Sequence, residues 1–248
     1  MKLTLDSLPK ALEQSLKPLY LLSGDEALLT NEVADKISQA AGKKGFDDKQ
    51  HFYVEPSFNW QQVSQASQSL SLFSNKKCLI IQLRNWKLDS AGKECLNQIA
   101  QATTVNTIVI VKGPKLEGTT AKTKWFTQLS SAGIWLPIFP IALEQLPRWI
   151  NQRGKKFGLK LDQTQAQCLA EKTENNLLAT EQALHKLSLH GGAVTQELID
   201  DIVESSAQYD IYKLVDACLL GQGERANKIF EMIKAQGHEP VLINWALA

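Results

Sequence analysis

The segment SGDEALL, residues 23–29, is the first place where residue types and spacing could do nucleotide chemistry, because it follows an apolar run at 19–22. A phosphate loop needs glycines that let backbone N–H groups face the phosphates, a lysine for the β- and γ-phosphates, and a Ser or Thr hydroxyl for magnesium. This segment has one glycine and no lysine, and it places Asp25 and Glu26 where phosphate would sit. Two carboxylates there would repel a triphosphate, which argues against a working NTPase.

Other catalytic arrangements are also missing. The strand end that would hold magnesium and polarise water should carry adjacent acids, but it reads Gln82, Leu83 and Arg84. The sequence has no G-x-S-x-G, no H-E-x-x-H, and no Cys or Ser beside a His. No catalytic residue is predicted. A catalytic triad assembled from residues far apart in the chain is the alternative that these patterns do not test.

The cysteines and histidines do not form a metal-binding pattern. Zinc sites use clustered soft ligands, whereas the four cysteines are far apart and form no C-x-x-C pair: Cys78, Cys95, Cys168 and Cys218. We expect buried free thiols, and neither a metal site nor a cofactor.

A second unusual segment, QSLSLFSNKK at 68–77, crowds Leu70, Leu72 and Phe73 among polar residues just before the apolar run CLIIQL. Two interpretations are open from these residues alone. Leu70 could close the preceding helix while Phe73 caps the core of a sheet, or the Leu72–Phe73 pair could be an exposed anchor for a partner.

The elements that must position these segments alternate along the first part of the chain. Five apolar runs read as buried strands, and the segments between them show helical spacing of apolar residues. The strands are expected at 19–24, 51–56, 77–83, 106–113 and 134–139, and the helices at 25–42, 59–70, 90–102 and 120–133. This pattern predicts a doubly wound, mostly parallel α/β sheet covered on both faces.

From about Leu143 the pattern becomes entirely helical, with expected helices at 143–159, 162–173, 176–192, 195–206, 210–223 and 224–237. The boundary is expected between Pro140 and Leu146. The last segment, EPVLINWALA, reads as an apolar helix without a cap, from which we expect a further C-terminal domain in the natural protein.

Charge and hydropathy narrow the possible surroundings. Residues 1–140 carry 16 Lys and Arg against 12 Asp and Glu, within a chain whose net charge is +1. Two interpretations of this charge are considered: the first part of the chain contacts phosphates, for instance through Lys112, Lys115, Lys122 and Lys124, or these lysines form a solvated surface. The solvated surface is the favoured interpretation. Apolar runs such as IWLPIFPIAL are shorter than the roughly 18 residues that cross a bilayer, and there is no signal-peptide core, so a cytoplasmic protein without membrane contact is expected.

A resemblance then covers nearly the whole chain. The blocks YLLSGDEALLTNE, QSLSLFSNKKCLIIQL, VIVKGPKLEGTTAKTKWFTQL, LPRWINQRGKKFGLKLD, NLLATEQALHKLSL and DIYKLVDACLLGQGERANKIFEMIKAQGHEPVLINWAL follow in this order. In this arrangement the chain resembles the delta-subunit family of the bacterial DNA polymerase III clamp loader. The resemblance implies an AAA+-like α/β domain without a functional P-loop at 1–140, a helical lid domain at 141–208, and the start of a truncated helical collar domain at 209–248.

The resemblance also implies a role for the second unusual segment. In the family, a short element of the form Gln, any residue, Leu or Met, Ser, Leu, Phe inserts into an apolar pocket of the ring-shaped sliding clamp. The matching residues here are Gln68, Leu70, Ser71, Leu72 and Phe73, with Ser69 at the variable position.

The implied function is that of a non-catalytic subunit that helps to open the clamp for loading on primed DNA, within a DNA polymerase holoenzyme. Implied partners are the sliding clamp (beta subunit), the gamma/tau and delta prime subunits, and primed DNA through the assembled complex. The Ser-Arg-Cys arginine-finger motif of neighbouring loader subunits is absent. The alternative is an enzyme, a divergent NTPase or nucleotide-dependent DNA-remodelling protein, which nucleotide binding would distinguish.

Overall fold

The computed structural model describes residues 2–68, 76–101, 106–173, 176–206, 211–235 and 243–244. The chain divides into two compact units, Met1–Ile141 and Ala142–Ala248.

The first unit is built on a five-stranded sheet in the order β2-β3-β4-β1-β5, with all neighbouring strands parallel. The strands are β1 (Leu19–Ser23), β2 (Asp48–Val54), β3 (Lys77–Leu83), β4 (Thr107–Gly113) and β5 (Ile134–Pro137). β3, β4 and β1 are almost continuously apolar, as expected of parallel strands that are buried on both faces. The predicted doubly wound parallel sheet is therefore confirmed.

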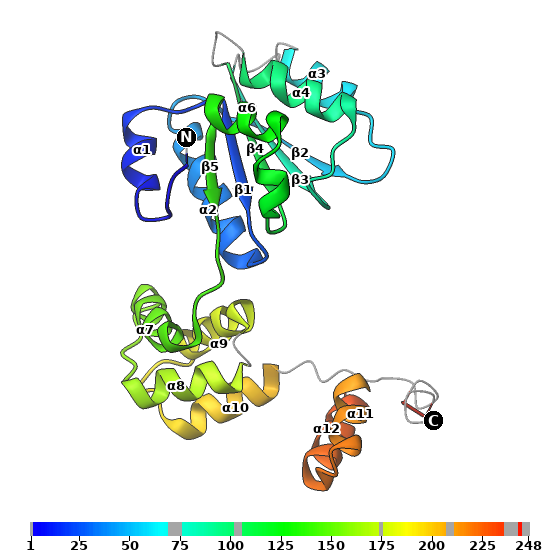
Figure 1. Cartoon of the computed structure of the whole chain (residues 1–248). Helices are drawn as coiled ribbons and strands as arrows, with labels where there is room; N and C mark the ends of the chain where they lie inside the picture. Colours follow the sequence, from blue (N-terminus) through cyan, green and yellow to red (C-terminus); the bar gives the residue numbers. More distant parts are fainter. Residues whose placement is uncertain are drawn as a thin grey trace. The chain divides into compact units, whose positions relative to one another are not determined.

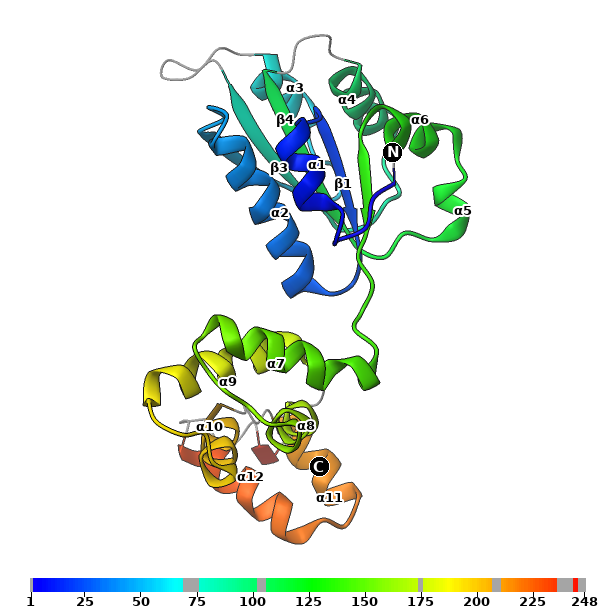
Figure 2. The ribbon, with the colours of Figure 1, turned by 90° about the vertical axis from the view of Figure 1, so that its left-hand side faces the viewer.

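Helices cover both faces of this sheet (Figures 1 and 2). One face carries α1 (Leu8–Gln14) and α2 (Ala27–Gly42), and the other carries α3 (Gln61–Gln68), α4 (Ser90–Ala100) and α6 (Lys124–Ala132), with the single-turn α5 (Gly118–Ala121) before α6. Inward side chains of β1, β3 and β4 pack with the α3, α4 and α6 helices into one core cluster.

Phe126 is the centre of that cluster. Its ring is fully buried and meets three tryptophan rings edge-to-face, with centroid distances of 5.8 Å to Trp86, 5.7 Å to Trp125 and 5.2 Å to Trp135. Edge-to-face pairs add to the free energy of burying the rings themselves. This packing holds α6 against the segment after β3 and the start of β5.

Several elements differ from the sequence prediction. α1 was not expected, because its seven residues bury only Leu8 and Leu12, which is too short a pattern to identify. β2 begins at Asp48 rather than at 51, because it is an edge strand whose residues alternate between half-buried and exposed. The helix expected at 120–133 is two helices, α5 and α6.

Every element in the described part of the second unit is helical. Its helices are α7 (Leu146–Lys156) after a 3-10 turn at Leu143–Gln145, α8 (Gln163–Lys172), α9 (Leu177–His190), α10 (Gln196–Ser206), α11 (Ile211–Leu219) and α12 (Gly223–Ala235). α8 begins with a capping box, in which Asp162 and Gln165 each bond the other's backbone N–H. α7 packs on α8 and α9, α10 packs on α8 and α9, and α11 packs on α12.

In the described residues, no helix is both long and apolar enough to cross a membrane.

Candidate functional site

Of the residues predicted to bind a partner, the structure describes Gln68. It is the last residue of α3 and its side chain is exposed. Leu70, Ser71, Leu72 and Phe73 lie outside the described residues, so their role stays a prediction. The site can be built only from the helix that leads to this segment and the strand that follows it.

α3 is a short amphipathic helix that packs against β3 and α4. Val63 and Ala66 are buried, while Gln61, Gln65 and Gln68 are exposed. Its start is capped because the Asn59 side-chain oxygen accepts a 3.0 Å hydrogen bond from the backbone N–H of Gln61. The helix therefore has a defined start and a buried face.

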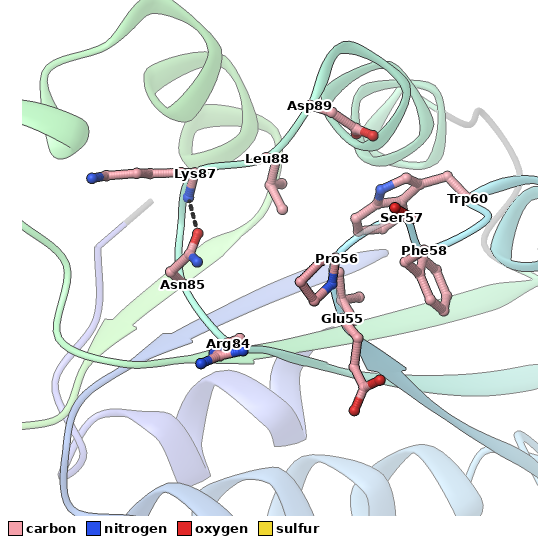
Figure 3. Close-up of a pocket in the computed structure, with 11 residues that line it drawn as sticks. Glu55, Pro56, Ser57, Phe58, Trp60, Arg84, Asn85, Lys87, Leu88 and Asp89 are labelled. Carbon is pink, nitrogen blue, oxygen red and sulfur yellow. Dashed lines mark hydrogen bonds between the residues drawn. The ribbon is translucent and has the colours of Figure 1, made fainter.

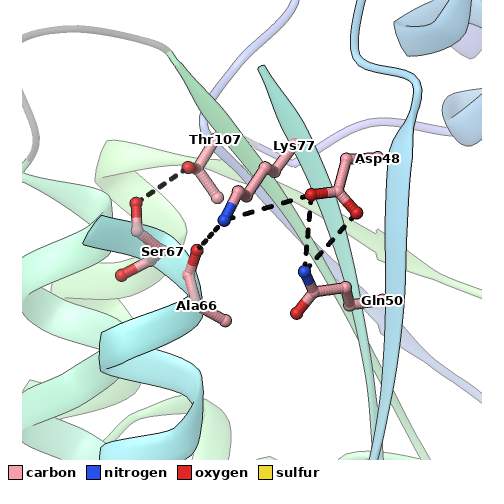
Figure 4. Close-up of polar contacts among 6 residues, drawn as sticks. All are labelled: Asp48, Gln50, Ala66, Ser67, Lys77 and Thr107. Atoms are coloured by element: carbon pink, nitrogen blue, oxygen red, sulfur yellow. Dashed lines mark hydrogen bonds and ion pairs between the residues drawn. The ribbon is translucent and has the colours of Figure 1, made fainter. Parts of the chain in front are cut away.

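The end of α3 is held by side chains from two strands (Figure 4). The Lys77 ammonium, at the start of β3, donates a 3.1 Å hydrogen bond to the carbonyl oxygen of Ala66. The Thr107 hydroxyl, at the start of β4, donates a 3.1 Å hydrogen bond to the carbonyl oxygen of Ser67. Both carbonyls belong to the last turn of the helix, whose C=O groups have no partner within the helix. Sequence analysis missed these two residues, and the available signal was a lysine at the start of an apolar strand.

The loop between β1 and α2, where a phosphate would bind, is occupied by the protein's own groups. Glu26 caps α2, its carboxylate accepting a 3.3 Å hydrogen bond from the backbone N–H of Leu28. Asp25 Oδ1 accepts a 2.8 Å hydrogen bond from the backbone N–H of Lys115. A helix N-terminus attracts anions through its free N–H groups and dipole, and here a carboxylate already lies at it.

Gly24 has a packing reason that is independent of phosphate. A Cβ atom at this position would collide with the carbonyl oxygen of Ile138. Glycine is therefore required, because the chain after β5 passes close to the end of β1. The backbone N–H of Ile138 also donates a 2.7 Å hydrogen bond to the carbonyl oxygen of Ser23, the last residue of β1. The one glycine of the SGDEALL segment is thus no sign of a phosphate loop.

A pocket of about 170 Å³ with a mixed polar and apolar wall lies at the carboxyl ends of β2 and β3 (Figure 3). Its wall includes Trp60 and charges of both signs, among them Glu55, Arg84 and Lys87. In Figure 3 the Glu55 and Lys87 side chains extend in different directions. Asp89, also on the wall, caps α4 by accepting a 2.7 Å hydrogen bond from the N–H of Gly92. The lining does not converge on one class of ligand.

The lysines considered for phosphate contact do not share one environment. Lys112 donates a 2.9 Å hydrogen bond to Asn31 on α2, and partial burial lowers the pKa of its ammonium group, which nearby Asp35 partly counteracts. Lys115, Lys122 and Lys124 are exposed. The structure therefore separates Lys112 from the other three by its contact with α2.

We expected all four cysteines to be buried, and for two of them this expectation is wrong. Cys78 and Cys95 are buried, and burial raises the pKa of both thiols, but Cys168 is half-buried and Cys218 on α11 is exposed. Cys218 follows Ala217 on a two-helix pair whose buried side is formed by other residues, so helical spacing turns it outward. Among the residues described, no three His, Cys, Asp or Glu side chains lie close enough together to hold a metal ion.

Comparison with known proteins relates the chain to one protein family. The family model described as DNA polymerase III, delta subunit matches residues 20–139. The chain is 31% identical over 240 residues to the DNA polymerase III subunit delta of Escherichia coli (strain K12), covering 96% of this chain and 70% of the relative. It is also 31% identical over 237 residues to the subunit of the same name from Haemophilus influenzae, covering 94% of this chain and 69% of the relative.

Solved structures show the same fold at lower identity. The Bacillus subtilis DNA clamp loader delta protein matches with a TM-score of 0.64 and 16% identity, over 98% of this chain and 75% of that one. The Thermotoga maritima RuvB Holliday junction branch migration motor matches with a TM-score of 0.53 and 13% identity, over 86% of this chain and 75% of that one. The AAA+-like architecture is therefore confirmed, including the helical part that follows the sheet.

Proposed function

The chain belongs to the delta-subunit family of DNA polymerase III, a family of clamp-loader subunits, and we propose that it binds the ring-shaped sliding clamp through residues 68–73 and helps to open it. The observation that carries this proposal is the identity to the Escherichia coli delta subunit over nearly the whole chain. Within that relationship, the QSLSLF segment begins at Gln68, the last residue of α3, and matches the family's clamp-binding pattern at every specified position.

The residue types of this segment suit a small, strong anchor. An aliphatic side chain beside an aromatic one buries a large apolar area in a partner pocket at little cost in conformational entropy. Gln68 at the exposed end of α3 adds a polar group that can hydrogen-bond the rim of such a pocket. We assign Leu72 and Phe73 as anchors, and Gln68, Leu70 and Ser71 as supporting contacts.

The remaining parts of the proposal follow from the family. The partners would be the sliding clamp (beta subunit), the gamma/tau and delta prime subunits, and primed DNA through the assembled loader. Residues 1–140 would form the AAA+-like domain, 141–208 the lid, and 209–248 part of the collar that joins the subunits. ATP chemistry would belong to other subunits, because carboxylates occupy the loop where phosphate would bind in this one.

Clamp affinity measured by surface plasmon resonance on a Leu72→Ala/Phe73→Ala variant tests the proposal. Burying each side chain contributes roughly 1.5–3 kcal/mol, so losing both should weaken binding by about 3–6 kcal/mol. The melting temperature should hardly change if the pair serves a partner rather than the core. A matched control is Leu219→Ala/Leu220→Ala, an apolar pair 80% and 68% exposed on the second unit.

Normal clamp binding by the Leu72→Ala/Phe73→Ala variant would contradict the proposal. A collapsed melting temperature would contradict it too, since that result would identify the pair as part of the core.

A further inference from the structure

Three polar residues form a row across the sheet directly beneath the end of α3. In the strand register, Asp48 of β2 is paired with Lys77 of β3, and Lys77 is paired with Thr107 of β4. Register partners in a parallel sheet project from the same face. Leu79 and Ile81 lie on the same face of β3 as Lys77, because side chains two residues apart in a strand point to the same side. Both belong to the core cluster that contains Val63 and Ala66 of α3, so this is the face that α3 covers.

Lys77 is an unusual member of this row, because its side chain is only 5% exposed. A buried lysine is stable only when its ammonium group is paired and hydrogen-bonded. Asp48 supplies a carboxylate 4.0 Å from the Lys77 ammonium, and the Ala66 carbonyl accepts its hydrogen bond at 3.1 Å. Gln50 in turn donates to the Asp48 carboxylate at 3.4 Å, as Figure 4 shows.

The position of these contacts links them to the candidate clamp-binding segment. A positive charge at the C-terminus of a helix interacts favourably with the helix dipole, and it satisfies carbonyls that otherwise lack partners. Lys77 and Thr107 bond the carbonyls of Ala66 and Ser67, the two residues immediately before Gln68. The last turn of α3, at the start of the candidate clamp-binding segment, is therefore attached to two neighbouring strands of the sheet.

We propose that Lys77, supported by Asp48 and Thr107, is a positioning residue for clamp binding. By fixing the last turn of α3 on the sheet, it holds Gln68, the first residue of the candidate clamp-binding segment, in place for the partner and so lowers the entropy cost of binding. It touches the helix end rather than the clamp. This inference rests on the proposed function, because it assumes that residues 68–73 contact the clamp.

The test is a series of variants of this chain, each measured for clamp affinity and for thermal melting. Lys77→Met removes the ammonium group but keeps a long unbranched side chain, and we expect its Kd for the clamp to rise about tenfold. Lys77→Arg keeps the charge and the donors and should restore most of the affinity. Lys49→Met removes the same charge from an exposed position on β2 and should change the Kd less than twofold.

Two further measurements separate positioning from general stability. Amide hydrogen exchange at residues 65–68 should accelerate in Lys77→Met at temperatures well below its melting point, while the amides of β4 keep their protection. Thr107→Val deletes only the hydroxyl that bonds Ser67 and should raise the Kd about threefold. If Lys77→Met does not fold, the clamp affinity of Thr107→Val is the measurement that tests the inference.

Unchanged clamp affinity in Lys77→Met, or in Thr107→Val where that variant carries the test, would overturn the inference. The Leu72→Ala/Phe73→Ala variant belongs in the same series, because it shows which idea has failed. If that variant loses binding while the Lys77 and Thr107 variants bind normally, the proposed function stands and the positioning role falls. If it binds normally, the proposed function itself falls.

Discussion

The Asp25 carboxylate accepts a 2.8 Å hydrogen bond from the backbone N–H of Lys115, which joins the loop after β1 to the loop after β4. In a parallel α/β sheet, ligands usually bind outside the carboxyl ends of the strands, where these two loops lie. Here the loops are bonded to each other, and Glu26 occupies the start of α2. The sheet is a parallel α/β sheet, but protein carboxylates lie in the loop where a phosphate would bind.

The first prediction is that the purified chain does not bind Mg-ATP at submillimolar concentration in isothermal titration calorimetry. Asp25 and Glu26 would repel the triphosphate, and the SGDEALL segment has no lysine to offset them. An ATP-binding AAA+ protein titrated in the same buffer is the positive control. Saturable binding with a micromolar Kd would revive the divergent-NTPase alternative.

The second prediction concerns the polar end of the clamp-binding segment. Gln68→Ala should weaken clamp binding by about 0.5–1.5 kcal/mol, the usual net value of one hydrogen bond, and thus far less than loss of Leu72 and Phe73. Gln65→Ala is the matched control, because Gln65 is also exposed on α3 but lies one turn earlier. Equal effects of the two substitutions in surface plasmon resonance would show that Gln68 makes no specific contact.

The third prediction concerns the core of the first unit. Phe126→Ala should lower the free energy of unfolding by about 3–5 kcal/mol, because it leaves a cavity among three tryptophan rings. Urea unfolding followed by tryptophan fluorescence measures this change. Phe139→Ala removes the same side chain where it is 63% exposed and should cost less than 1 kcal/mol. Similar losses in the two variants would contradict the packing described for Phe126.

The fourth prediction concerns thiol reactivity. The thiolate is the reactive form, and burial raises the pKa of Cys78 and Cys95, so both should react with a disulfide reagent only at higher pH or after unfolding. Cys218 is exposed and should react first near neutral pH. A Cys218→Ser variant should lose this fast phase. Rapid labelling of Cys78 in the native protein at neutral pH would show that β3 is not buried as the structure indicates.

The strands were the most predictable part of the fold. β3 and β4 are continuous apolar runs bounded by polar segments, a pattern that parallel strands buried on both faces impose on a sequence. The start of β2 was harder to predict, because an edge strand needs apolar residues on one face only and its first residues are polar. α1 escaped for a similar reason, since two buried leucines are too few to establish a helical period.

The candidate site was predictable only in part. A leucine and a phenylalanine on a polar segment, and carboxylates in place of a phosphate loop, are local features that the sequence determined by itself. The role of Lys77 was decided by tertiary structure, because Asp48, Lys77 and Thr107 are far apart in the chain and only the strand register brings them together. The packing of α3 on that face then places the Ala66 carbonyl within hydrogen-bond distance of the buried Lys77 ammonium group. A hydrogen bond depends on the distance and angle between two groups in space, which the order of residues in the chain does not reveal.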